Sequence, residues 1–218
     1  MGFAWPRERV IGRLWRGPDV DPDQLVAGYL QGAFPMDAPE RARAPIEYFV
    51  ATPRAVLPIG EGFHVPRTVR RRLRSADFDI RIDRAFDAVL EACAQREEGT
   101  WLSPRLAQAY RTLHARGLAH SVEAWRDGTL AGGLFGVALG GLFTSESMFH
   151  RVSDAGNAAL VATHAHLLER SYTLWDIQTA TDHTRRFGLL EMSHQEYLAV
   201  LRTALQHTCA FDANAPRA

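Results

Sequence analysis

Apolar residues recur with helical spacing in several stretches of the chain. After Asp83, four apolar side chains stand at positions i, i+3, i+4 and i+7, which is the pattern of an amphipathic helix: Phe86, Val89, Leu90 and Cys93. Ser103 followed by Pro104 is typical of a helix start, and Gly117 of a helix end. Helices are expected over residues 23–32, 83–96, 104–117, 155–170 and 194–206.

Shorter apolar runs predict strands. The runs cover residues 46–50, 78–82, 120–125, 130–137, 142–145 and 172–178. Asp127-Gly128 and Gly140-Gly141 supply turn residues between three of them, so residues 120–145 are expected to form an antiparallel meander. The order of the expected helices and strands is similar to the acetyltransferase-like (GNAT) arrangement, and by this analogy we expect an α+β protein with a mixed sheet flanked by helices.

Proline is concentrated near the N-terminus. Seven prolines fall between residues 18 and 58: Pro18, Pro22, Pro35, Pro39, Pro45, Pro53 and Pro58. Closely spaced prolines interrupt regular helices and strands, which favours a small irregular N-terminal domain over residues 1–60. The boundary is expected near Gly60-Glu61-Gly62, with a larger domain over residues 61–218.

Composition narrows the class of protein. The chain has 218 residues, of which 46% are hydrophobic and 23% charged, as in a folded domain rather than a disordered chain. Two cysteines exclude a disulfide framework and a four-thiolate zinc site, and none of the nine histidines stands at a metal-ligand spacing. Residues 1–9 lack the apolar core of a signal peptide and no run is long enough to span a bilayer, so we expect a cytoplasmic protein.

Charge is balanced overall but concentrated in one place. The 25 basic and 25 acidic residues cancel, and every basic residue apart from histidine is arginine. Five arginines fall within residues 67–74, and on a helix Arg67, Arg70, Arg71 and Arg74 share one face. This face suits a phosphate backbone, while an ordinary solvated face remains the alternative.

Four polar or aromatic side chains are candidates for the chemistry. Trp101 stands just before a helix start, where it can stack on a base or pack beneath the helix. Glu146 ends an apolar strand, and Asp176 and Gln178 share one face of another because side chains alternate along a strand. Buried polar groups need partners or a function, so these three are expected to form either a structural network or a site.

Ordered blocks along the chain resemble the leucyl/phenylalanyl-tRNA–protein transferases. The resemblance extends from about Leu25 to Leu201, and its blocks follow the family order. They are G-Y-L-Q-G-A-F-P-M from Gly28, F-H-V-P-R from Phe63, E-E-G-T-W-L from Glu97, A-Y-R-T-L-H from Ala109, A-H-S-V-E-A-W from Ala119, G-G-L-F-G-V from Gly132, E-S-M-F from Glu146, D-I-Q from Asp176 and D-H-T from Asp182.

The resemblance implies a fold, a reaction and a set of site residues. Family members pair a small N-terminal domain with an acetyltransferase-like (GNAT) domain, and transfer leucine or phenylalanine from leucyl- or phenylalanyl-tRNA to proteins that begin with Arg or Lys. The product carries an N-degron for proteolysis, and the reaction uses no metal or other cofactor. A monomer is expected.

By the same resemblance, each candidate residue receives a role. Trp101 matches the tryptophan that stacks on the terminal adenosine of the tRNA. The arginine face matches the basic cluster that holds the tRNA. Glu146 matches the glutamate that orients the glutamine, while Asp176 and Gln178 match the pair that activates the acceptor amine. Three further positions match the pocket for the aminoacyl side chain or lie beside it: Leu134, Phe143 and Trp175.

Two other functions remain open from the residues alone. A coenzyme-A-dependent N-acetyltransferase of the same fold needs a glycine-rich loop that cradles pyrophosphate at a helix start. Residues 151–156, R-V-S-D-A-G, miss this pattern because Asp154 places a charge there. A non-enzymatic RNA-binding module would use the arginine run but would leave Glu146, Asp176 and Gln178 without a purpose.

Overall fold

The computed structural model describes residues 20–37, 46–95 and 99–212. The N-terminal segment 1–9, the helix position Arg96 and the motif residues Glu97 and Glu98 lie outside the described residues. None of the helices in the described part is both long and apolar enough to cross a bilayer.

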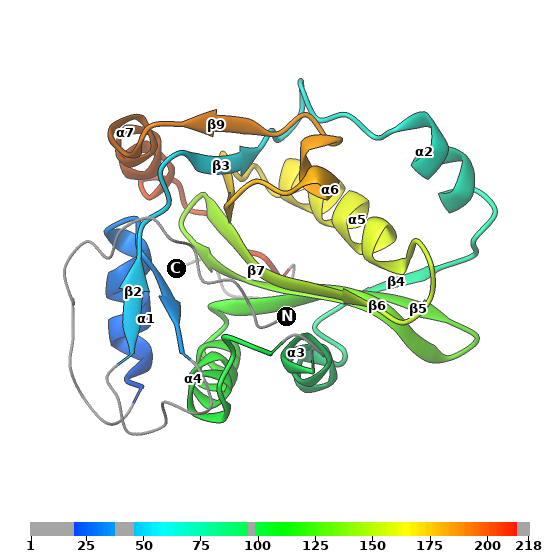
Figure 1. The fold of residues 1–218 in the computed structure, drawn as a ribbon, viewed down its shortest axis with the longest axis horizontal. Coiled ribbons are helices and arrows are strands. Elements are labelled where there is room, and N and C mark those ends of the chain that lie inside the picture. The colour runs from blue at the N-terminus through cyan, green and yellow to red at the C-terminus, as the bar shows by residue number, and fades with distance from the viewer. Residues whose placement is uncertain (1–19, 38–45, 96–98, 213–218) are drawn as a thin grey trace.

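The N-terminal part contains a helix and a small sheet. Helix α1, Pro22–Leu30, begins at Asp21, whose carboxylate accepts a hydrogen bond from the backbone N–H of Asp23. It leads into β1, Phe34–Met36, which pairs antiparallel with β2, Glu47–Phe49. These elements lie beside helix α4 at one end of the molecule (Figure 1).

A seven-stranded mixed sheet organises the rest of the chain. Its strand order is β4-β5-β6-β7-β8-β3-β9. Every neighbouring pair is antiparallel except β7 and β8, which run parallel and pair only through residues 142–144 and 174–176. The strands are β3 Arg54–Leu57, β4 Asp79–Ile82, β5 Ala119–Arg126, β6 Thr129–Leu139, β7 Leu142–His150, β8 Leu174–Gln178 and β9 Leu190–Met192.

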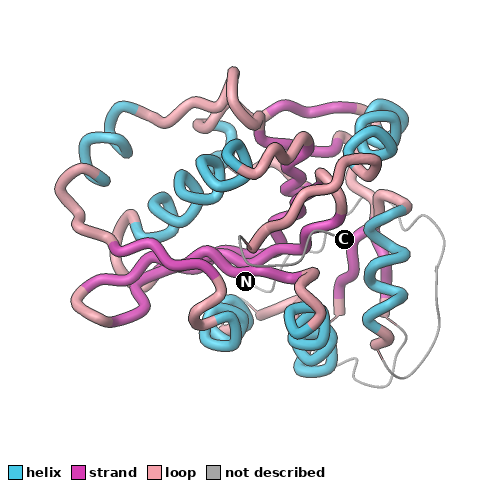
Figure 2. Tube along the Cα trace, turned by 180° about the vertical axis from the view of Figure 1, so that it is seen from behind, coloured by secondary structure: helices cyan, strands magenta, loops and turns pink. Residues whose placement is uncertain are grey.

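Helices cover both faces of this sheet, as Figures 1 and 2 show. Helices α3, Phe86–Ala94, and α4, Pro104–Ala115, pack against one face, and α5, Ala155–Glu169, packs against the other. Three shorter or peripheral helices complete the fold: α2 Arg67–Leu73, α6 Asp182–Arg185 and α7 His194–Ala204. The mixed sheet flanked by helices expected from the sequence is therefore confirmed.

Most expected elements are present. The five expected helices correspond to α1, α3, α4, α5 and α7, and the meander corresponds to β5, β6 and β7. Strand β7 extends to His150, so Glu146 lies within the strand and not at its end, because pairing with β6 continues through residues 145–150. Strands β1, β3 and β9 and helix α6 were not predicted, since three or four residues are too few to show a periodicity.

Strand β3 lies inside the large sheet between β8 and β9. It precedes the expected domain boundary near residue 60, so the N-terminal part of the chain supplies one strand to the larger sheet. Arg54, the first residue of β3, is thereby brought next to β8.

Candidate active site

Glu146 occupies a β-bulge in β7. The β6–β7 pairing joins Phe135 to Ser147 and Gly136 to Ser145, so Glu146 is the extra residue of the bulge. A Cβ on Gly136 would collide with the Thr144 carbonyl oxygen, which restricts this position to glycine. Bulges re-aim side chains next to functional sites, and this one turns Glu146 toward β8.

Asp176 and Gln178 lie on β8 opposite Glu146. The β3–β8 register shifts between Ala55 and Val56, which pair with Gln178 and Asp176, so Ile177 is the extra residue of a second bulge. Gln178 has a left-handed backbone with φ of 59°, an uncommon conformation for a residue other than glycine. Its backbone N–H donates to Asp176 Oδ1 at 2.9 Å, which holds this conformation.

A hydrogen-bond network joins the two bulges. Gln178 Nε2 donates to Thr144 Oγ1 at 2.7 Å and to Glu146 Oε1 at 3.3 Å. The Tyr110 hydroxyl, on α4, donates to Glu146 Oε2 at 3.1 Å. The structure therefore brings together Glu146, Asp176 and Gln178, as the sequence analysis expected of a network or a site.

The environment of Glu146 changes its acidity. Burial raises the pKa of its carboxyl to about 7, and the Asp176 carboxylate nearby also raises it, whereas hydrogen bonds from Tyr29, Tyr110 and Thr144 lower it. A carboxyl with a pKa near 7 can gain or lose a proton at physiological pH, as a general base must.

Asp176 is fully buried and its oxygens are occupied. Arg54 Nε donates to Asp176 Oδ1 at 2.9 Å, and Arg54 Nη2 donates to Oδ2 at 2.5 Å. The Tyr197 hydroxyl adds a hydrogen bond to Oδ2 at 2.8 Å. With no exposed surface and with these partners, Asp176 holds its neighbours in this structure, and its role in activating the acceptor amine stays a prediction.

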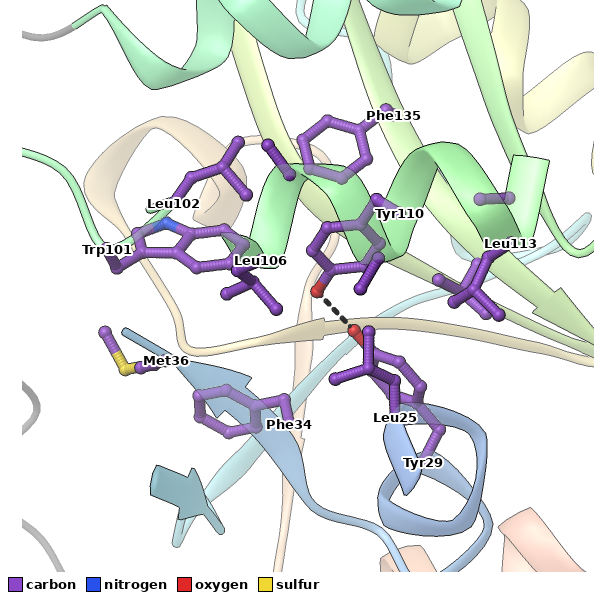
Figure 3. Close-up of a cluster of buried hydrophobic side chains, with 14 of the residues drawn as sticks. Leu25, Tyr29, Phe34, Met36, Trp101, Leu102, Leu106, Tyr110, Leu113 and Phe135 are labelled. Atoms are coloured by element: carbon purple, nitrogen blue, oxygen red, sulfur yellow. Dashed lines mark hydrogen bonds between the residues drawn. The ribbon is translucent and has the colours of Figure 1, made fainter. Parts of the chain in front are cut away.

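Trp101 lines a small pocket together with two residues of this network, Glu146 and Gln178. A pocket of about 120 Å³ has walls from β1, the segment before α4, β7 and the end of β8, lined by Phe34, Pro35, Met36, Trp101, Glu146, Gln178 and Thr179. Figure 3 shows Trp101 beside Leu102 and Leu106, with Met36 below it. The Trp101 and Tyr110 rings meet edge to face at 6.4 Å. An aromatic ring and a carboxyl therefore share one small pocket.

The arginine face lies apart from this pocket. Helix α2 carries Arg67, Arg70 and Arg71, and Arg74 follows it; all four are exposed. Together with His64, Val65 and Thr68 they line one concavity with a volume of about 590 Å³. The predicted shared face is confirmed, and no acidic side chain of the described residues lines this concavity.

Comparison with known proteins decides the family. The family model described as leucyl/phenylalanyl-tRNA protein transferase matches residues 56–202. A leucyl/phenylalanyl-tRNA–protein transferase from Herpetosiphon aurantiacus is 43% identical over 192 residues, covering 88% of this chain and 98% of that one. A transferase of the same name from Salinibacter ruber is 44% identical over 187 residues, covering 86% and 81%.

The chain belongs to the leucyl/phenylalanyl-tRNA–protein transferase family. The family membership expected from the sequence blocks is confirmed, and so is the class of enzyme, an aminoacyltransferase. Similar solved structures include a ribosomal-protein-alanine N-acetyltransferase from Brucella melitensis biovar Abortus 2308, with a TM-score of 0.36 and 21% identity over 48% of this chain and 81% of that one. A GCN5-related N-acetyltransferase-like protein from Streptococcus suis has a TM-score of 0.35 and 15% identity, covering 64% and 58%.

Three residues that the family resemblance assigns to the aminoacyl pocket lie in a closed core. Leu134, Phe143 and Trp175 have at most 1% of their surface exposed and pack in one cluster with residues of α5. None of them lines the pocket at Trp101. Their role in holding the aminoacyl side chain stays a prediction.

Several members of the site were missed in the sequence. Arg54 and Tyr197 hold Asp176, and Tyr29 and Tyr110 extend the network of Glu146. One signal was available for Arg54, since an arginine at the head of the apolar run R-A-V-L needs a buried partner. The partner itself, 122 residues away, could not be read from the sequence.

Among the described residues, a metal would bind at a cluster of ligating side chains and coenzyme A at the start of α5. No group of three or more His, Cys, Asp or Glu side chains in the described ranges could hold a metal ion. At the start of α5, Asp154 accepts a hydrogen bond from Asn157 Nδ2 and lies 3.6 Å from Arg72, so a carboxylate stands where a pyrophosphate would bind.

Proposed function

We propose that this chain transfers leucine or phenylalanine from leucyl- or phenylalanyl-tRNA to the N-terminal amine of proteins that begin with Arg or Lys, which marks them for proteolysis. The observation that carries the proposal is the shared pocket of Trp101, Glu146 and Gln178 in a member of this family. An aminoacyl ester already contains an activated carbonyl, so the residues need only position the two substrates and transfer the protons that the attacking nitrogen loses.

The tRNA end of the reaction uses two surfaces. The exposed arginines of the α2 face, Arg67, Arg70, Arg71 and Arg74, bind phosphates through their forked guanidinium groups. Trp101 offers its ring to the terminal adenosine, because every base has a face that can stack. The apolar walls supplied by Phe34 and Met36 contribute to enclosing the terminal nucleotide and its aminoacyl group.

The acceptor end uses the two bulges. Gln178 donates through Nε2, and among the described residues its Oε1 accepts no hydrogen bond, so Oε1 is available to an incoming ammonium. The ammonium loses a proton to Glu146, whose pKa of about 7 suits an amine with a pKa of about 7.7–8.0. Asp176 acts indirectly: its carboxylate accepts the backbone N–H of Gln178 and so holds Gln178 in place.

Bond making and breaking then balance. The neutral amine attacks the ester carbon, a C–N bond forms, and the C–O bond to the ribose breaks. Glu146 releases the ammonium proton to solvent, then accepts the second proton that the nitrogen loses as the C–N bond forms and passes it to the ribose oxygen as the C–O bond breaks. One proton is therefore released to solvent in each transfer. Holding the two substrates together supplies much of the acceleration, on the order of 7–11 kcal/mol in well-oriented intramolecular reactions.

A single assay tests the proposal. Purified protein is mixed with radiolabelled leucyl- or phenylalanyl-tRNA and a peptide that begins with Arg, without coenzyme A, and label in the peptide is measured. A peptide with a blocked α-amine is the matched control, and acetyl-CoA in place of the tRNA tests the acetyltransferase alternative. Label in the free-amine peptide alone supports the proposal, whereas acetylation or no transfer rejects it.

A further inference from the structure

Arg54 is a buried cation that joins two walls of the candidate site. Only 1% of its surface is exposed. Its guanidinium uses all three nitrogens: Nε and Nη2 donate to Asp176, and Nη1 donates to the Gly32 carbonyl oxygen at 2.9 Å. The guanidinium carbon also lies 5.0 Å from the centre of the Phe34 ring and 4.4 Å from that of Tyr197.

The contacts of Arg54 with Asp176 fix the side chains at the end of strand β8. The fork of Arg54 meets both carboxylate oxygens of Asp176, and a bidentate pair sets the rotation of the carboxylate as well as its position. Asp176 Oδ1 accepts the backbone N–H of Gln178, whose left-handed conformation aims the amide at Thr144 and Glu146. The orientation of Gln178 therefore depends on Arg54 through one intermediate residue.

The other side fixes the apolar wall of the pocket. Gly32 ends the turn after α1 with φ of 77°, two residues before β1 begins. A Cβ at Gly32 would lie 2.9 Å from Leu198, so this turn is also packed tightly against α7. By binding the Gly32 carbonyl and lying over the Phe34 ring, Arg54 sets where β1 stands relative to β8.

We propose that Arg54 is a positioning residue of the transfer reaction, which holds Gln178 through Asp176 and the Phe34 wall through Gly32 in a single fixed geometry. This inference rests on the proposed function. Arg54 lines neither the pocket at Trp101 nor the arginine concavity, so it acts through its neighbours and not on the substrates.

Arg54→Lys is the informative variant. Lysine keeps the positive charge beside Asp176 but is a point donor that cannot hold both carboxylate oxygens and the Gly32 carbonyl at once. We expect kcat for peptide aminoacylation to fall by roughly 10- to 100-fold, as a displacement of about 1 Å can cause, while peptide KM and aminoacyl-tRNA Kd change by less than about threefold.

Arg185→Lys is the matched control. Arg185 also makes a bidentate ion pair, with two hydrogen bonds to Glu191 of 2.8 and 3.0 Å. This pair is exposed, and neither residue lines the pocket at Trp101. Its kcat is expected within about twofold of wild type, as for surface pairs generally. A wild-type kcat in folded Arg54→Lys would overturn the proposal, and so would an effect confined to peptide KM or tRNA Kd.

Tyr197→Phe gives an independent test if Arg54→Lys fails to fold. It removes one donor to Asp176 Oδ2 but keeps the ring beneath the guanidinium, so we expect this variant to fold. We expect a fall in kcat of roughly three- to tenfold, again with little change in peptide KM; an unchanged kcat would contradict the proposal. An inactive wild-type protein would reject the proposed function itself, which is a different outcome from active variants of an active wild type.

Discussion

The hydroxyl groups of Tyr29 and Tyr110 lie 2.6 Å apart, although 81 residues separate them in the chain (Figure 3). Tyr29 belongs to α1 and Tyr110 to α4, and the Tyr110 hydroxyl also donates to Glu146 on β7. Burial and the nearby Glu146 carboxylate raise the pKa of both tyrosines, so both stay hydroxyls. The acidity of Glu146 thus depends on donors from two helices that approach each other only in the folded chain.

Tyr110→Phe is expected to shift the pH dependence of transfer. The Tyr110 hydrogen bond lowers the pKa of Glu146, so its removal raises that pKa above about 7. If Glu146 accepts the proton, it must be ionised, and the acid limb of the kcat profile moves to higher pH. The measurement is kcat over a range of roughly pH 5.5 to 9 with both substrates saturating.

Tyr172→Phe serves as the control for this variant. The Tyr172 hydroxyl is buried and has no hydrogen-bond partner among the described residues, and Tyr172 packs in the core beside α5. Its acid limb should coincide with that of the wild type. An unshifted profile in Tyr110→Phe would rule out Glu146 as the group that titrates.

Removing two arginines from the α2 face should weaken tRNA binding. In the double variant Arg70→Ala, Arg71→Ala, fewer counterions are released on binding, so Kd rises and its salt dependence flattens by about one unit of log–log slope for each phosphate that is no longer bound. Kd for charged tRNA is measured between roughly 50 and 300 mM salt. Arg202→Ala, an exposed arginine on α7, is the control; the same slope in all three proteins would make the α2 face an ordinary solvated surface.

Two substitutions can separate the proposed stacking role of Trp101 from its packing in the core. It is 9% exposed and packs against Tyr110, so Trp101→Ala should lower the free energy of unfolding by about 3–5 kcal/mol. It should also raise KM for aminoacyl-tRNA by the equivalent of about 1–3 kcal/mol of stacking. Trp101→Phe retains an aromatic face and should recover much of both. Normal KM in a destabilised Trp101→Ala protein would make this tryptophan a core residue only.

Asp176→Asn should abolish most of the transfer without releasing the donor. The substitution leaves Arg54 buried without its anion, which is expected to lower the free energy of unfolding by about 3–5 kcal/mol and to loosen Gln178. In the proposed function the aminoacyl-tRNA is held elsewhere, by Trp101 and the arginine face, so its Kd should change little. Both quantities are measured on protein shown to be folded by circular dichroism.

Asp87→Asn is the control for the aspartate variant. Asp87 pairs with Arg111 at 2.8 Å on the surface, and its substitution should cost less than about 1 kcal/mol and leave kcat unchanged. Near-wild-type transfer by folded Asp176→Asn would remove Asp176 from the mechanism even though family membership stands.

The sequence by itself determined much of this protein. Helical periodicity located α3 and α4, the glycine-containing turns located the β5–β7 meander, and the ordered blocks around Trp101, Glu146 and Asp176 identified the family. These signals are local, because each depends on side chains within a few residues of one another along the chain. Local spacing also placed four arginines correctly on one shared face, three of them on α2 and Arg74 directly after it.

Only the tertiary structure decided what each polar group touches. Period-two alternation indicated that Asp176 and Gln178 share a side of β8, but it could not show that Asp176 is already paired with Arg54 while Gln178 and Glu146 line the pocket. The two bulges that aim Glu146 and Gln178 arise from pairing with other strands, and β3 meets β8 although more than a hundred residues separate them in the chain. Burial and long-range pairing depend on how elements pack together, and these properties decide which carboxylate is paired with an arginine and which lines the pocket.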